Sequence, residues 1–153
     1  MAVDVQFALR GSPPLAPEQI AGWADSVLER MGEERTAVDA CIRIVGEAES
    51  KRLNATYRGV DKPTNVLSFP SGATDPHTGG KALGDIIICD PVVRREAQDQ
   101  GKRLRDHYAH MVVHGMLHLF GYDHVDPLEA DSMEDTEREI LGRFGIADPY
   151  GVG

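Results

Sequence analysis

Hydrophobic and polar residues recur with two different periods along the chain. Near its start, Val3, Val5, Phe7 and Leu9 alternate with mostly polar residues, the pattern of a strand with one buried face. Later segments repeat apolar residues every three to four positions, which is typical of helices packed on a core. Together these patterns predict four strands, at Val3–Leu9, Ala37–Val45, Val66–Phe69 and Leu83–Cys89, and five helices, at Glu18–Met31, Glu47–Tyr57, Asp90–Gln100, Leu104–Phe120 and from Asp126 onward.

The order of these elements predicts an α/β fold. A strand, a helix and a second strand in succession favour a right-handed parallel crossover. Pro70 is expected to stop the third strand, and Asp90 to cap the helix whose first residue is Pro91. With a length of 153 residues, we expect one domain over residues 1–153, with a small mixed four-stranded sheet and about five helices.

Composition places the chain among ordinary globular proteins. It is 41% hydrophobic and 27% charged, and no apolar run approaches the length of a membrane span. The first residues carry no basic segment of the kind that opens a secretory signal. Cys41 and Cys89 fall in predicted buried strands without a C-x-x-C motif, so we expect reduced thiols in a cytoplasmic protein that does not enter a membrane.

Charge is distributed unevenly around a net charge of −9. Residues 51–105 hold ten lysines and arginines against six acidic residues, whereas residues 123–153 hold two arginines against nine acidic residues. This asymmetry suggests one surface suited to a polyanion and another that is solvated, although opposite charges on an ordinary surface would give similar counts.

The helix predicted at Leu104–Phe120 is apolar almost all the way round, so it should be buried in the centre of the fold. The rest of its surface is a row of histidines. At about 100° of rotation per residue, they lie within about 80° around the helix axis. They are His107, His110, His114 and His118. Gly121 is placed to end the helix in a left-handed conformation. The chain can then turn back and bring His124 towards the row.

Three imidazoles that converge from a helix and a turn make a catalytic type of zinc site. His110 and His118 would lie about 12 Å apart along the helix axis, too far for ligands of one ion. His114, His118 and His124 are therefore the predicted ligands of one zinc ion per chain. Nickel, copper or iron also accept imidazole ligands. His110 is at most a group that supports the ligands or contacts the substrate, or else a packed core histidine.

The same spacing occurs in zinc peptidases of the pattern H-E-x-x-H-x-x-G-x-x-H, where the glutamate is the general base. Gly115 stands at the position of that glutamate here. The sequence therefore has the metal-binding pattern of a peptidase without its base, which argues against peptide hydrolysis.

The run from His114 to His124 resembles the signature of the YbeY family of bacterial zinc-dependent endoribonucleases. The stretches Leu53–Pro70 and Leu83–Ile86 and the terminal Asp148-Pro149-Tyr150 are similar to the same family pattern. This resemblance implies a zincin-like central helix, cleavage of single-stranded RNA, a role in 3′-end maturation of small-subunit rRNA and in ribosome quality control, and association with the small ribosomal subunit and its assembly factors.

Arg58 lies in the Tyr-Arg-Gly part of the resembling stretch and is the candidate catalytic residue, because arginine stabilises charge on a phosphate; it could instead only close a helix. Asp123 could orient a histidine, and Asp85 could hold a histidine or Arg58; each could also be a structural cap. A zinc peptidase and a non-catalytic ribosome-assembly factor with a structural zinc are the alternative functions.

Overall fold

The computed structural model describes residues 3–33, 38–74, 76, 80–122 and 126–150. One mixed sheet has the strand order β1-β2-β4-β3. Strand β1 pairs parallel to β2, β2 pairs parallel to β4, and β3 pairs antiparallel to β4. The predicted α/β class, parallel crossover and mixed four-stranded sheet are confirmed, with strands β1 (Val3–Ala8), β2 (Val38–Val45), β3 (Val66–Thr74) and β4 (Lys81–Cys89).

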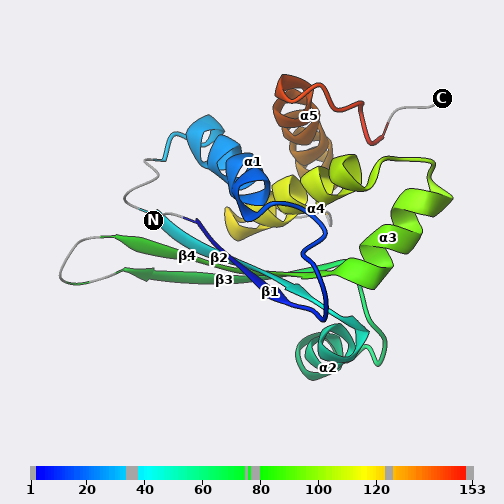
Figure 1. Cartoon of the computed structure of the whole chain (residues 1–153). Helices are drawn as coiled ribbons and strands as arrows, with labels where there is room; N and C mark the ends of the chain where they lie inside the picture. Colours follow the sequence, from blue (N-terminus) through cyan, green and yellow to red (C-terminus); the bar gives the residue numbers. More distant parts are fainter. Residues whose placement is uncertain (1–2, 34–37, 75, 77–79, 123–125, 151–153) are drawn as a thin grey trace.

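The helices are divided between the two faces of this sheet (Figure 1). Helices α1 and α4 cover one face, with α5 packed against their outer side; α2 lies on the other face, and α3 flanks the end of the sheet. Their bounds are α1 (Pro17–Arg30), α2 (Glu47–Arg58), α3 (Asp90–Asp99), α4 (Leu104–Leu119) and α5 (Pro127–Arg143). No helix in the described part of the chain combines the length and apolar character needed to cross a membrane.

Helix α4 lies at the centre of the main hydrophobic core. Its residues Val112, Met116 and Leu117 have no exposed surface, and they share this core with Ile86 and Ile88 of β4. Fully burying a side chain of this size contributes about 1.5–3 kcal/mol, so the helix is held firmly against the sheet. A smaller cluster of Val45, Leu67 and Ile87 lies on the α2 face. The expected central position of the histidine helix is confirmed.

Strand β3 does not stop at Pro70 as the sequence predicted. It continues to Thr74, with an irregular register between Pro70 and Ala73. Because β3 is an edge strand, a proline without an N–H group can be accommodated there. Gly84 pairs with Pro70 and has a φ of 147°, and a Cβ at this position would overlap the carbonyl oxygen of Phe69.

The start of α3 also differs from the prediction. Cys89 is the capping residue, and Asp90 is the first residue of the helix. The Asp90 carboxylate instead accepts a short hydrogen bond from the hydroxyl of Tyr108 and one of 2.8 Å from Nε of Arg94. Asp90 therefore ties α3 to α4 through its side chain. Both cysteines are free; Cys89 is buried, and Cys41 is half-buried.

Candidate metal centre

Helix α4 carries four histidines along one face. His107 and His110 are buried, whereas His114 and His118, nearer the end of the helix, are partly exposed. Neighbouring rings meet edge to face along the row. After Leu119 the helix ends, and Gly121 has the predicted left-handed conformation with a φ of 95°. The histidine row and its glycine stop are therefore as expected.

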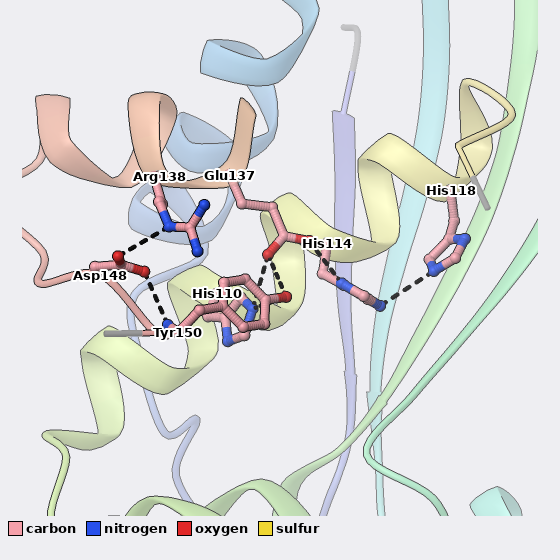
Figure 2. Close-up of polar contacts among 7 residues, drawn as sticks. All are labelled: His110, His114, His118, Glu137, Arg138, Asp148 and Tyr150. Atoms are coloured by element: carbon pink, nitrogen blue, oxygen red, sulfur yellow. Dashed lines mark hydrogen bonds and ion pairs between the residues drawn. The ribbon is translucent and has the colours of Figure 1, made fainter. Parts of the chain in front are cut away.

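Glu137 of α5 points into this row of histidines (Figure 2). Its side chain has no exposed surface. One carboxylate oxygen, Oε1, lies 2.8 Å from Nδ1 of His114. The other, Oε2, lies 3.0 Å from Nε2 of His110 and 2.6 Å from the hydroxyl oxygen of Tyr150. A single buried carboxylate thus binds two histidines and a tyrosine.

This contact determines the hydrogen position on His114. An ionised carboxylate only accepts hydrogen bonds, so the Nδ1 atom that faces it must carry the hydrogen. In the neutral imidazole the other nitrogen, Nε2, then has a lone pair available for a metal ion. Metal-binding histidines in proteins are commonly held by a carboxylate in this way.

Charge at Glu137 is consistent with the same arrangement. Burial by itself would raise the pKa of this carboxyl, but the hydrogen bonds from His110 and His114 outweigh burial and lower the pKa to about 2. The carboxyl is therefore ionised at neutral pH. Burial and the contact with Glu137 raise the pKa of the Tyr150 hydroxyl, which stays protonated and donates.

His118 extends the site beyond Glu137. Its Nε2 atom lies 3.1 Å from Nε2 of His114. Two imidazole nitrogens bound to one tetrahedral zinc ion, with bonds of about 2.0–2.1 Å, stand about 3.3 Å apart. The spacing of these two nitrogens therefore fits two ligands of a shared ion.

A second set of metal-binding atoms overlaps the first. His110, His114 and Glu137 each offer an atom within 4.8 Å of the others, so these three also form a possible metal-binding group. Its carboxylate oxygens, however, already accept hydrogen bonds from both imidazoles. The structure thus contains a metal-binding group, while the metal and the exact ligand set are matters for proposal.

Two predicted site residues, Asp123 and His124, lie outside the described residues. Asp85 is described: it is exposed on the sheet and lines a groove of about 560 Å³ together with Cys41, Arg43 and Tyr57. Its neighbour Ile86 lies in the core shared with α4. Since successive side chains of a strand point to opposite faces, Asp85 points away from the histidines.

Arg58 is the last residue of α2 and is exposed. Gly59 follows it in the left-handed conformation, with a φ of 70°. Helix α2 lies across the sheet from α4 (Figure 1). Arg58 is thus exposed at the end of a helix that lies on the other face of the sheet from α4, and its catalytic role stays a prediction.

Gly115, the residue that replaces the peptidase glutamate, faces the sheet. A Cβ atom built on it would lie 3.0 Å from Cγ2 of Ile86 and 3.3 Å from Oγ of Ser68. The Ser68 hydroxyl also donates to the carbonyl oxygen of Gly115 at 3.1 Å. A side chain at position 115 would therefore require Ile86 and Ser68 to shift.

Two residues of the site were not predicted, Glu137 and Tyr150. Glu137 lies in an acidic stretch that resembles a solvent-exposed helix face. Its spacing from apolar residues of the same helix, however, indicates a buried position. Met133, Ile140 and Leu141, at the −4, +3 and +4 positions, are all buried, so Glu137 shares their inward face. Tyr150 follows the last helix, and only the fold brings it to the site.

Comparison with known proteins identifies the family. Residues 10–145 match the family model described as endoribonuclease YbeY. Endoribonuclease YbeY of Alteromonas mediterranea is 48% identical over 153 residues, which cover 97% of this chain and 95% of that protein. The solution structure of TM1509 from Thermotoga maritima has the same fold, with a TM-score of 0.55 and 23% identity over 98% of this chain and 99% of that one. The chain belongs to the endoribonuclease YbeY family.

Proposed function

We propose that this chain is a zinc-dependent endoribonuclease that cleaves single-stranded RNA in the cytoplasm. One zinc ion per chain would be held by His114, His118 and His124. The substrate would be the 3′ end of small-subunit rRNA, and the partners the small ribosomal subunit and its assembly factors. The relative from Alteromonas mediterranea carries the name endoribonuclease, and it covers nearly the whole chain.

One observation carries the metal proposal: the Nε2 atoms of His114 and His118 lie 3.1 Å apart, while Glu137 binds the opposite nitrogen of His114. That combination suits two zinc ligands and the carboxylate that orients one of them. The overlapping set of His110, His114 and Glu137 would break the hydrogen bonds by which Glu137 holds both imidazoles. We therefore favour the first set.

A zinc ion in this position would supply Lewis-acid polarisation of a phosphoryl oxygen and acidification of a water molecule. The chain's own residues would hold the site in place. Glu137 keeps the hydrogen of His114 on Nδ1, and burial of Glu137 keeps water from competing for its oxygens. The site thus needs little reorganisation before reaction, which is how enzymes lower barriers for charged transition states.

Binding of RNA would depend on exposed cations away from the histidines. Arg52, Arg58 and Lys62 are exposed on α2 and in the loop after it. Cations at such positions attract the phosphate backbone and release its counterions. We propose that Arg58 contacts the RNA backbone and, through it, supports cleavage.

The two alternatives make different demands on the chain. A peptidase would need a carboxylate at position 115, where this chain has a glycine whose added Cβ would crowd Ile86. A non-catalytic assembly factor would bind zinc without cleaving RNA. An RNA-cleavage assay therefore separates the proposal from both.

The ligand set is tested by measuring zinc in purified His118→Ala and His110→Ala variants. The proposed set predicts that His118→Ala loses most of its zinc and that His110→Ala keeps most of it. The opposite result would favour the set with His110 and Glu137. Circular dichroism of both variants checks that the fold is retained.

The activity is tested on a single-stranded RNA and on the same RNA annealed to its complement. We expect the wild type to cleave the single strand, chelated protein and His118→Ala to be inactive, and added zinc to restore only the chelated wild type. Equal cleavage by all samples would indicate a contaminating nuclease and refute the proposal. A casein assay covers the peptidase alternative.

A further inference from the structure

The segment after α5 folds back onto the histidine row. Ile146 is buried in the main core. Oδ2 of Asp148 accepts a hydrogen bond of 2.8 Å from Nε of Arg138, and its Oδ1 accepts one of 2.8 Å from the backbone N–H of Tyr150. The Arg138 guanidinium also lies 5.5 Å from the centre of the Tyr150 ring. These contacts hold the Tyr150 ring in one place.

From this place Tyr150 reaches Glu137 (Figure 2). Its hydroxyl oxygen lies 2.6 Å from Oε2, the oxygen that also faces Nε2 of His110 at 3.0 Å. The second oxygen of the carboxylate faces Nδ1 of His114 at 2.8 Å. Two donors from α4 and one from the chain's last described residues therefore surround one carboxylate of α5.

The burial of Glu137 makes each of these donors important. With no exposed surface, the carboxylate has no bulk water to replace a lost partner. Hydrogen bonds to a buried charge are stronger than those between neutral groups, and a missing donor leaves part of that charge uncompensated. Without the hydroxyl of Tyr150, the carboxylate would turn to share its two imidazole donors differently, and the ring of His114 would follow.

We propose that Tyr150 is a positioning residue of the metal site, acting on His114 through Glu137. The inference rests on the proposed zinc function, and it adds a group that touches neither metal nor RNA. A purely structural role for Tyr150, in which its ring only fills space beside His110, would not involve the hydroxyl at all. Removal of that one oxygen atom separates the two roles.

The experiment compares Tyr150→Phe with Tyr57→Phe. Tyr57 is a matched control, because its side chain is 65% exposed and lies on α2, across the sheet from the histidines. Two quantities are measured on each folded protein: the zinc dissociation constant, by competition with a coloured chelator, and the ¹⁵N NMR signals of the His114 ring in metal-free protein. The second readout reports which ring nitrogen carries the hydrogen.

For Tyr150→Phe we expect zinc binding about threefold to tenfold weaker, less than the 10–100-fold typical of losing a direct partner of a ligand. The His114 signals should move from a fixed Nδ1–H form towards a mixture, while Tyr57→Phe matches the wild type. The inference is wrong if the zinc dissociation constant of Tyr150→Phe stays within twofold of the wild-type value. It is equally wrong if the His114 signals of this variant do not shift.

The role of Tyr150 can still be tested if the variant does not fold or if the wild type binds no zinc. If Tyr150→Phe fails to fold, Arg138→Gln replaces it, because Arg138 is part-exposed and holds the segment without touching Glu137. If the wild type itself binds no zinc, the proposed function fails, and the His114 signals of the metal-free proteins alone decide the role of Tyr150.

Discussion

The Nδ1 atom of His114 lies 2.8 Å from Oε1 of Glu137, so a residue of α5 determines which imidazole nitrogen can face a metal ion. In Glu137→Gln, the amide offers one acceptor oxygen to three donors, and its NH₂ group opposes at least one of them. We expect zinc binding to weaken about 10–100-fold. A chelator-competition titration measures this.

Glu139→Gln is the control for that experiment, because Glu139 lies on the same helix but is exposed and paired with Arg30. Its zinc affinity should equal that of the wild type. Equal affinities in both variants would show that the carboxylate at position 137 does not orient a ligand.

Gly115→Ala should destabilise the protein. The added methyl group would lie 3.0 Å from Cγ2 of Ile86, and overpacking of this kind typically costs about 1–3 kcal/mol, which should exceed the gain of about 0.5–1 kcal/mol that alanine has over glycine in a helix. Gly22→Ala is the matched helical control: nothing lies within 4 Å of its Cβ, so it should gain about 0.5–1 kcal/mol. Urea unfolding of both variants measures the difference, and an unchanged or raised stability of Gly115→Ala would contradict the close approach of α4 to the sheet.

His107 should make the stability of the metal-free protein depend on pH. Burial lowers the pKa of its imidazole, while the hydrogen bond with Glu96 raises it in part. Because the folded pKa lies below the unfolded value of about 6.5, the unfolded chain binds the proton more readily as the pH falls. Stability is thus full above pH 6.5 and declines below it, by no more than about 1.4 kcal/mol per pH unit from this residue.

In His107→Gln this part of the decline should disappear, so the variant loses less stability than the wild type between pH 7.5 and pH 5.5. Urea unfolding in the presence of a chelator measures both proteins at the two values. Parallel losses would mean that His107 is not the group responsible.

Arg58→Glu should weaken RNA binding more than it slows the chemical step. Arg58 is exposed at the end of α2, across the sheet from the histidines, so we expect a rise of about tenfold in KM with a smaller change in kcat. The dependence of log KM on log salt should also fall by about 1. Arg10→Glu, a change at an exposed arginine outside the proposed RNA-binding group, is the control, and an equal effect there would assign the loss to general charge.

The sequence predicted the fold wherever a pattern was local. Apolar periods, caps and turn residues located the strands and helices of the described residues, and Gly121 correctly marked the end of α4. The errors came where tertiary contacts override local preference. Pro70 lies within strand β3, which tolerates a proline because it is an edge strand of the sheet. Asp90 does not cap its helix; its carboxylate accepts hydrogen bonds from Tyr108 and Arg94.

The sequence predicted only those features of the candidate site that follow from a local pattern. Histidines spaced along one helix are visible in the sequence, but the carboxylate that binds them comes from α5, 23 positions beyond His114. Its surroundings in sequence are acidic, and only the burial of Met133, Ile140 and Leu141 distinguishes it. Tyr150 has no periodic pattern to identify it. The predicted ligand His124 and its neighbour Asp123 lie outside the described residues, and their roles remain predictions, as do the ligand roles of His114 and His118.

The hydrogen bond from Tyr150 to Glu137 can form only late in synthesis of the chain. The histidines are present once α4 has been made, but the carboxylate arrives with α5 and its tyrosine partner only at position 150. Domains are synthesised from the N-terminus at about 5–20 residues per second. A nascent chain therefore carries its sheet and histidine row for some time before Tyr150 has been made and the carboxylate can be fully held.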